Sequence, residues 1–236
     1  DAFRLIERIE KRHGSVVGIV HAAGVLDDGM MLSQTWDRFA RVMGPKVQGT
    51  EYLLAAAEEL SLQYLVLCSS VVSVLGSPGQ SNYGAANAVM DALAHHFCSQ
   101  GQKCVSVNWG PWGAGGMASE VDASTVNAWA DRGVSMIDRS LGLSCMESIL
   151  IGGQAQAMVL PVDWEKFVMG FGPGAEPAVI RAAASKVRHA ASSRTASSSP
   201  VSSLLQDLRA AGQSEAPGIL RSRIQAYLAT ILQLFE

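Results

Sequence analysis

One stretch, residues 65–93, constrains the fold of this chain more than any other, because it combines a strand, a loop and a helix in direct succession. Its first residues, Leu65 to Cys68, are apolar and predict a buried strand. Serines, glycines and a proline follow, and a helix is predicted from about Ser81. Open α/β sheets place their chemistry at the loop that joins the carboxyl end of a strand to the next helix. The stretch therefore predicts an α/β fold with a functional site at this loop.

Three polar side chains in this stretch stand at informative positions. Ser70 comes just past the predicted strand, Tyr83 follows thirteen residues later, and Asn87 comes four residues after that. Residues four apart on a helix lie on the same face, so Tyr83 and Asn87 are expected side by side.

The segment from Cys68 to Asn87 resembles the catalytic core of a ketoreductase domain from a type I polyketide synthase, within the short-chain dehydrogenase/reductase superfamily. The usual superfamily motif is Tyr-x-x-x-Lys. Here Asn87 takes the fourth position, and the lysine is Lys46, 24 residues before Ser70 on an earlier predicted helix. That exchange is similar to the ketoreductases of polyketide and animal fatty acid synthases. The resemblance implies a Rossmann-like, doubly wound parallel sheet, of which this chain holds the C-terminal catalytic part.

The resemblance also implies a role for each of four side chains. Reduction of a ketone needs a hydride on carbon and a proton on oxygen, and Tyr83 is the implied proton donor. A tyrosine with a pKa of ~10 gives up protons slowly near neutrality, and Lys46 is expected to lower that pKa by favouring the phenolate. Ser70 would bind the carbonyl oxygen, and Asn87 would order the lysine, a water or the helix backbone. Ser69 is the less favoured hydroxyl, because the spacing to Tyr83 selects Ser70. The alternative for Lys46 is a solvated surface lysine.

NADPH is the cofactor that the resemblance alone implies. Two short segments, after the predicted strands 16–20 and 103–109, are expected to line the nicotinamide side of the crevice: Ala22, Ala23, Gly24, Gly110, Pro111 and Trp112. For the first segment the alternative is tight packing at a strand exit, and His21 beside it is expected to be structural. No Gly-rich phosphate turn precedes the first predicted strand. We therefore expect the chain to begin inside the domain, after its phosphate-binding segment.

Five residues are implied by the resemblance to control stereochemistry: Leu26, Asp27, Asp28, Pro78 and Asn82. Together they mark a B-type ketoreductase, which delivers the D-configured β-hydroxyl. The tryptophan that marks A-type domains would fall at Leu75, where it is absent. The alternative for the two aspartates is that they charge the N-terminus of the next helix.

Composition and charge argue against several other classes of protein, among them nucleic-acid-binding and membrane proteins. The chain has 236 residues, of which 48% are hydrophobic and 17% charged, enough for one domain and part of a second. A net charge of −3 argues against a nucleic-acid surface. No apolar run reaches the ~18 residues of a spanning helix, and no signal peptide opens the chain, so we expect no membrane partner and a cytoplasmic location. No metal site is predicted, and the cysteines are expected to be buried free thiols in a reducing compartment: Cys68, Cys98, Cys104 and Cys145.

Periodicity predicts the other elements more coarsely. A helix over residues 31–60 is expected to be interrupted at Gly44-Pro45. Residues 117–137 would form a lid helix, whose Val121, Val126 and Trp129 contact either an acyl chain or the helix's own domain. A further helix is expected over residues 141–151 and a last strand over 156–162.

The chain is expected to divide into three parts. Residues 1–169 form the ketoreductase catalytic part, and residues 170–203, rich in Gly, Pro, Ala and Ser, form a flexible linker. Residues 204–236 form the helical start of an acyl carrier protein domain, although no Asp-Ser-Leu attachment site is present. A docking or dimerising helix is the alternative for this last part.

The predicted function is NADPH-dependent reduction of a carrier-bound β-ketoacyl thioester to the D-β-hydroxyacyl thioester. The implied partners are an acyl carrier protein bearing that thioester and other synthase domains in cis. Two alternatives remain: an inactive structural or docking fragment of a synthase, and a free-standing short-chain dehydrogenase for a small alcohol.

Overall fold

The computed structural model describes residues 2–60, 62–113, 123–172, 174–197, 204, 207–210 and 215–222. The chain divides into two compact units, residues 1–179 and residues 180–236. The first unit carries the sheet and every residue of the predicted catalytic part.

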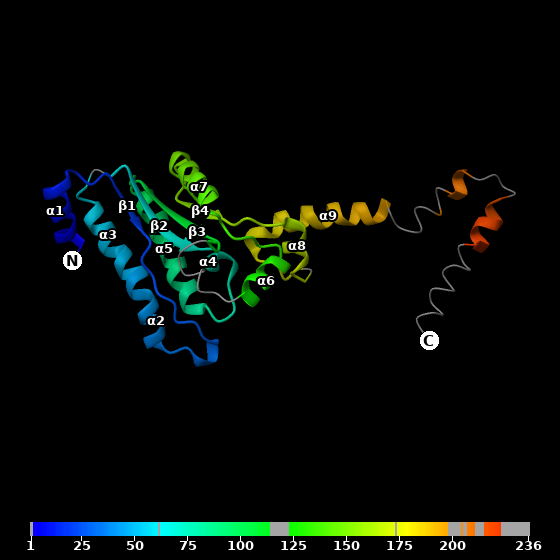
Figure 1. Cartoon of the computed structure of the whole chain (residues 1–236), viewed down its shortest axis with the longest axis horizontal. Coiled ribbons are helices and arrows are strands. Elements are labelled where there is room, and N and C mark those ends of the chain that lie inside the picture. Colours follow the sequence, from blue (N-terminus) through cyan, green and yellow to red (C-terminus); the bar gives the residue numbers. More distant parts are fainter. Residues whose placement is uncertain are drawn as a thin grey trace. The chain divides into compact units, whose positions relative to one another are not determined.

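A parallel sheet of four strands forms the centre of the first unit in the described ranges (Figure 1). Its order follows the chain: β1 (Gly18–His21), β2 (Tyr64–Ser70), β3 (Cys104–Trp109) and β4 (Gln156–Val159). Every residue of β3 is buried, as expected of a parallel strand that is covered on both faces. The predicted Rossmann-like α/β fold with a parallel sheet is confirmed.

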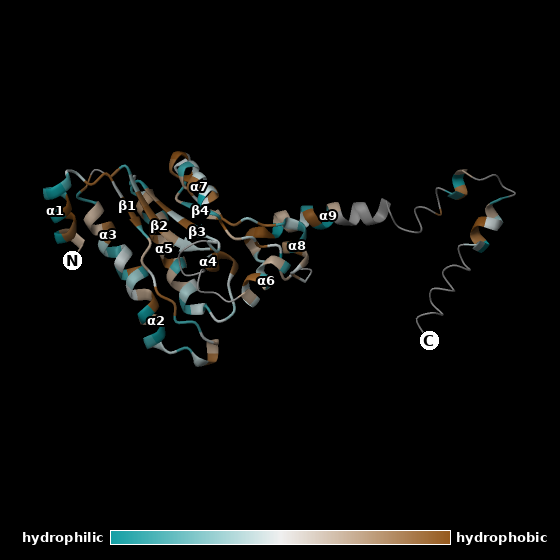
Figure 2. Ribbon diagram, viewed as in Figure 1, coloured by the Kyte–Doolittle hydropathy of each residue, from teal (hydrophilic) through white to brown (hydrophobic). Residues whose placement is uncertain are grey.

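Successive residues of β2 point to opposite faces of the sheet and enter separate core clusters. Leu65 and Leu67 pack in one cluster with Met90 of helix α5 (Ser81–Ser99). Val66 packs in the other with Ile149 of the helix that precedes β4. The hydropathy colouring shows apolar residues concentrated on these strands (Figure 2). Both faces are thus covered by helices, which makes the sheet doubly wound.

The helices that accompany the sheet follow its strands in alternation. Asp138 caps the helix that ends at Gly152, because its side chain accepts from the Leu141 amide at 2.9 Å. Gly153, with a φ of 68°, ends that helix in the left-handed conformation that glycine adopts most readily. The helices are α1 (Ala2–His13), η1 (Met31–Ser33), α2 (Trp36–Met43), η2 (Gly44–Gln48), α3 (Gly49–Ala57), α4 (Val72–Leu75), α5 (Ser81–Ser99), α6 (Ala123–Asp131), α7 (Arg139–Gly152), α8 (Trp164–Met169) and η4 (Ala178–Ile180).

The α-helix is interrupted at Gly44-Pro45, as predicted, but the chain stays helical through the interruption. A π-helical turn, η2, joins α2 to α3 there, and the Gly49 amide donates to the Gly44 carbonyl five residues back. Pro45 has no amide hydrogen to donate, and the widened turn accommodates that missing hydrogen bond. The turn also places Lys46 inside the protein, where only 2% of its surface is exposed.

Much of the predicted linker 170–203 is helical, while its role as a linker stays a prediction. Helix α9 spans Arg181–Ser197, and its alanines, lysine and arginines are residues that favour helices. The prediction gave too much weight to the serines and to the small residues. Residues 198–203 lie outside the described residues. In the predicted carrier segment, residues 204, 207–210 and 216–222 are helical.

Two further predictions are met in part. The last strand is shorter than expected and ends at Val159. Within the predicted lid, α6 is helical and Val126 and Trp129 are half-buried, whereas Val121 lies outside the described residues.

Candidate active site

The predicted site residues meet at the carboxyl edge of the sheet. Ser70 ends β2, and the segments 22–24 and 110–112 follow β1 and β3. Helix α5 packs against β2 and β3 and carries Tyr83 and Asn87, which are both buried. Turn η2, which contacts α5, supplies Lys46. Four side chains from three elements are therefore gathered at one place, and they are the four that the family resemblance implies.

Lys46 is a buried ammonium over an aromatic ring. Its Nζ donates to the Cys68 carbonyl at 3.1 Å and lies 5.2 Å from the centroid of the Tyr83 ring, a cation–π arrangement. Burial lowers the pKa of Lys46 to about 8, while Cys68 and Asp91 act in the opposite direction. The alternative of a solvated surface lysine is therefore excluded.

Gly24 leaves the space that the Lys46 side chain fills. A Cβ at Gly24 would lie 2.9 Å from Cε of Lys46, closer than real contacts of this kind. Ala22 and Ala23, the two residues before it, are exposed at the end of β1. This segment thus packs at a strand exit and also faces the site, so the two interpretations of it are compatible.

The environment of Tyr83 differs from the prediction. The pKa of Tyr83 is raised, chiefly by burial; the amide of Asn87 and the hydroxyl of Ser70 lower it, and Asp28 raises it further. The Lys46 ammonium lies over the face of the ring and donates to the Cys68 carbonyl, and the net effect of these surroundings is a raised pKa. Tyr83 therefore holds its proton more firmly than an ordinary tyrosine.

The two adjacent serines have separate surroundings. Ser70 Oγ accepts from the Val72 amide at 3.2 Å, which leaves its hydroxyl hydrogen to donate elsewhere. Ser69 Oγ contacts the Asn87 carbonyl at 3.4 Å and accepts from Asn108 at 3.1 Å. Ser69 is thus occupied by internal contacts, which favours Ser70 as the hydroxyl that meets a ligand.

Asn87 presents an unused acceptor to the site. Its Nδ2 donates to the Tyr83 carbonyl at 2.8 Å, within the same helix. Its Oδ1 is buried and has no hydrogen-bond partner among the described residues. A buried acceptor without a partner is costly, so this oxygen suits a polar group of a bound molecule or a water.

The predicted stereocontrol residues are joined by hydrogen bonds. The Asn82 side chain donates to the Asp27 carbonyl and accepts from the Tyr83 amide, both at 2.8 Å. Gln80 donates to the Asp28 carboxylate at 2.9 Å. The loop that carries Leu26 and the turn that carries Pro78 are also linked, since the Gly29 amide donates to the Gly79 carbonyl. Leu26 and Pro78 are themselves exposed.

The Asp27 carboxylate is held away from the reaction by two arginines of α2. Arg38 donates through Nε at 2.8 Å and Arg41 through NH1 at 2.8 Å. Asp27 is therefore an anchor of the loop, whereas Asp28 faces the turn before Tyr83.

The predicted cofactor segment after β3 is built into the core. The Trp112 ring lies 5.0 Å from that of Trp109, and a Cβ at Gly142 would collide with it. The Pro111 carbonyl accepts from the Ile137 amide at 2.7 Å. A Cβ at Gly110 would lie 2.7 Å from Leu160. These contacts show packing roles for Trp112 and Gly110.

Sequence reasoning missed a buried polar network behind Ser70. Asp91, Ser73, Ser106 and Asn108 are joined by hydrogen bonds between α5, α4 and β3. One sequence signal was present: Asp91 comes four residues after Asn87, on the same helix face. The other partners follow only from strand pairing.

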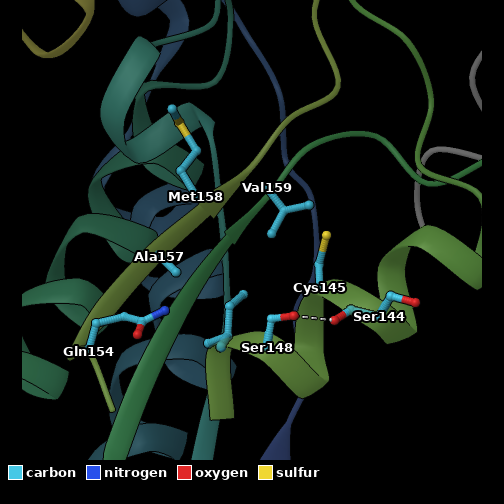
Figure 3. A pocket seen from close by; sticks show the side chains of 8 residues that line it. Ser144, Cys145, Ser148, Gln154, Ala157, Met158 and Val159 are labelled. Carbon is cyan, nitrogen blue, oxygen red and sulfur yellow. Dashed lines mark hydrogen bonds between the residues drawn. The ribbon is translucent and has the colours of Figure 1, made fainter. Parts of the chain in front are cut away.

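A shallow hollow of about 360 Å³ lies elsewhere, between α7 and β4 (Figure 3). Cys145, Ser148 and Met158 are among its lining residues, and Ser148 donates to the Ser144 carbonyl of its own helix. It contains none of the site residues above.

Across the described ranges, no cluster of three or more His, Cys, Asp or Glu side chains is arranged for a metal. No helix in those ranges is long and apolar enough to cross a bilayer.

Comparison with known proteins identifies the proteins that this chain resembles. The family model for the KR domain matches residues 1–114. Polyketide synthase GfsB of Streptomyces halstedii is 40% identical over 158 residues, which are 67% of this chain and 3% of that protein. A phenolphthiocerol/phthiocerol polyketide synthase of Mycobacterium tuberculosis is 30% identical over 233 residues, which are 98% of this chain and 10% of that protein.

Solved structures of ketoreductases also resemble this chain. An A-type ketoreductase from a modular polyketide synthase matches with a TM-score of 0.64 at 33% identity, over 69% of this chain and 34% of that one. The ketoreductase from the first module of phoslactomycin biosynthesis in a Streptomyces species matches with a TM-score of 0.66 at 31% identity, over 75% and 40%. The chain thus spans a tenth or less of these two synthases, and two fifths or less of these two solved ketoreductases.

Proposed function

This chain belongs to the ketoreductase domains of type I polyketide synthases, and from that premise we propose that it reduces a β-ketoacyl thioester with NADPH as hydride donor. The observation that carries the proposal is the meeting of Tyr83, Ser70 and Lys46 at the carboxyl edge of a parallel sheet. Open α/β sheets bind nucleotide cofactors and their substrates at this edge.

The residues present fit a nicotinamide cofactor. The site offers a buried ammonium, exposed backbone at the end of β1, and at Asn87 Oδ1 a buried acceptor without a partner among the described residues. When bound, NADPH would supply the hydride to the carbonyl carbon. Ala22 to Gly24 and the backbone of residues 110–112 would lie along it.

Tyr83 and Ser70 would act on the carbonyl oxygen. Because its pKa is raised, Tyr83 is protonated at neutral pH and has a proton to give to the oxygen as charge develops there. The Ser70 hydroxyl, whose oxygen already accepts from Val72, would donate to the same oxygen and stabilise its charge.

Lys46 would stabilise the tyrosine after it has lost its proton. With a pKa of about 8 it is mostly charged at neutral pH, and its position over the Tyr83 ring places that charge near the phenolate that forms. Asn87 Oδ1 would hold a water or a ligand group, from which Tyr83 or Lys46 could be reprotonated.

The product is proposed to be the D-β-hydroxyacyl thioester, on an acyl carrier protein that works with other synthase domains in cis. The stereochemical proposal rests on Leu26, Asp27, Asp28, Pro78 and Asn82 and not on overall likeness, since an A-type ketoreductase is among the similar structures. The bonds from Asn82 to Asp27 and from Gln80 to Asp28 tie this loop to the start of the helix that carries Tyr83.

The test is NADPH oxidation with a β-ketoacyl N-acetylcysteamine thioester. The chain would be joined to the N-terminal cofactor-binding segment of a solved ketoreductase. Tyr83→Phe is expected to lower kcat by roughly 100-fold or more. Tyr64→Phe is the matched control, because Tyr64 lies at the opposite end of β2 from Ser70 and should leave kcat unchanged.

Each outcome has a separate meaning. A D-hydroxy product that depends on Tyr83 supports the whole proposal, and an L-hydroxy product leaves the reductase in place but contradicts the B-type assignment. Equal rates with NADH would contradict the cofactor preference. Folded protein that binds NADPH without turnover would favour a structural fragment.

A further inference from the structure

A buried carboxylate that the proposed reaction does not use lies behind the site. Asp91 is 7% exposed and stands four residues after Asn87 and eight after Tyr83 on α5, so the three share a face. Buried carboxylates are rare in proteins unless hydrogen-bonded or paired. Its surroundings therefore call for a physical explanation.

Three neutral side chains donate to Asp91. Ser106 Oγ donates to Oδ1 at 2.5 Å, while Ser73 Oγ and Asn108 Nδ2 reach Oδ2 at 2.7 and 2.8 Å. Ser106 and Asn108 are two residues apart on β3 and so lie on one face of the sheet. Asp91 acts only as an acceptor in these bonds, as an ionised carboxylate does.

Two of these donors also lie within hydrogen-bond distance of the Ser70 carbonyl; the single Ser73 hydroxyl hydrogen is shared between that carbonyl and Asp91, whereas Asn108 Nδ2 has two hydrogens. Ser73 Oγ lies 2.9 Å from the Ser70 carbonyl, and Asn108 Nδ2 lies 3.3 Å from the same oxygen. The Ser106 hydroxyl instead donates to the carboxylate alone, from further back along β3. The network thus has one branch, through Ser73 and Asn108, that reaches Ser70 at the carboxyl end of β2. The other branch, through Ser106, does not reach it.

We propose that Asp91 is a positioning residue of this site: its carboxylate fixes Ser73 and Asn108, and these fix the backbone that aims the Ser70 hydroxyl at the ligand. The proposal rests on the proposed function for the role of Ser70. The placement of Ser70 by the network does not depend on that function and can be measured separately.

Asp91 also bears on the charge of Lys46. The titratable groups around Lys46 are Cys68 on β2, His21 on β1, and Tyr83 and Asp91 on α5. Asp91 and Cys68 raise the pKa of Lys46 against the effect of burial. Removal of the Asp91 charge should therefore move the pKa of Lys46 below about 8, an effect that a purely packing role would not produce.

The first experiment uses the chain as it stands. Asp91→Asn keeps the size of the side chain and removes its charge. Titration of lysine ¹³Cε resonances, with Lys46→Arg for assignment, should show a lower pKa for Lys46 in the variant. The amide resonances of Val71 and Val72, next to Ser70, should shift. Asp138→Asn, at the exposed cap of α7, is the control and should change neither. Unchanged Lys46 and Val72 signals in a folded Asp91→Asn protein would overturn the proposal.

The second experiment compares the two serines. Each donates one hydrogen bond to Asp91, so Ser73→Ala and Ser106→Ala should lower stability by similar amounts. In the fused reductase described above, only Ser73→Ala is expected to lower kcat, by about tenfold with KM unchanged. Equal kcat for the two variants would overturn the proposal, and this pair remains informative if Asp91→Asn does not fold. If the fusion has no reductase activity at all, the proposed function fails, whereas the resonances of the chain alone still decide the role of Asp91.

Discussion

Lys46 carries a charge inside the protein, and the stability of the protein should follow its titration. Its pKa is about 8 in the folded state, against 10.5 for an ordinary lysine. Between these values the unfolded chain holds a proton that the folded chain has lost, so stability should rise with pH across this window by about 3 kcal/mol. Below about pH 8 both states are protonated, and the contribution is constant.

Urea unfolding at pH values between roughly 7 and 10 checks this expectation. Lys46→Met has no charge at this position, so the difference in unfolding free energy between the two proteins should change over the window. Other titrating groups, such as Cys104, are present in both proteins and largely cancel in that difference. A constant difference would mean that the ammonium is not desolvated.

Gly24→Ala should damage the site more than the fold. The added methyl group would lie 2.9 Å from Cε of Lys46, so the lysine must move from its place over the Tyr83 ring. We expect kcat of the fused reductase to fall roughly tenfold, with a loss of stability of about 1 kcal/mol. Gly44→Ala is the control, because only the end of the Gln48 side chain lies near its Cβ, at 3.9 Å.

At the scale of single residues, the sequence predicts which side chains form the site better than it predicts the pKa values of those side chains. The family resemblance supplied the site residues, and local pattern placed Ser70 at a strand end and Tyr83 and Asn87 on one helix face. The position of the Lys46 ammonium over the face of the ring and the burial that raises the pKa of Tyr83 both depend on packing between distant elements. Asp91 was missed for the same reason, since two of its partners, Ser106 and Asn108, lie on strand β3, which only the folded sheet brings next to α5.

At the scale of elements, the loop after β1 is fastened to helix α2. The Asp27 carboxylate accepts from Arg38 and Arg41, and its side chain is 12% exposed, so these pairs are partly shielded from solvent. Asp27→Ala should lower the unfolding free energy by about 2 kcal/mol. Asp28→Ala, one residue along, removes a single exposed contact with Gln80 and should change stability by less than about 0.5 kcal/mol.

Denaturant unfolding of both variants provides the measurement, and the product configuration from the fused reductase adds a second readout. Loss of D-selectivity is expected for both variants, because each releases one end of the loop. A stable Asp27→Ala protein with unchanged selectivity would contradict the anchoring role.

The elements themselves follow from the sequence, except that helical structure is underestimated at two places. The Gly44-Pro45 pair predicts a break in a helix, but a π turn retains the helix, because one widened turn removes the need for the missing amide. The composition of residues 181–197 predicts a linker, but their alanines and basic residues form α9. At the first place a Gly-Pro pair and at the second a Gly-, Pro-, Ala- and Ser-rich composition argued against a regular helix, and the local hydrogen-bond pattern decided otherwise.

At the scale of the whole sheet, the fold was predictable because the strands are short apolar runs separated by helical segments. The order of the strands follows from the family resemblance, and their register and the polar layer behind β2 do not follow from pattern. Hydrogen exchange should be slowest in β2 and β3, which have a partner on both sides, and faster in β1 and β4. Equal protection across all four strands would contradict this ranking.

The coincidence of strand order and chain order has a consequence for synthesis of the protein. Each strand pairs with the one that precedes it, so a strand that leaves the ribosome meets an edge that already exists. About 42 residues separate β1 from β2, which is several seconds of translation at ~5–20 residues per second. The sheet can therefore grow in one direction while the chain is still being made. Lys46, Ser70, Tyr83 and Asp91 are all translated, together with the strand that fastens them, before the ribosome reaches β4.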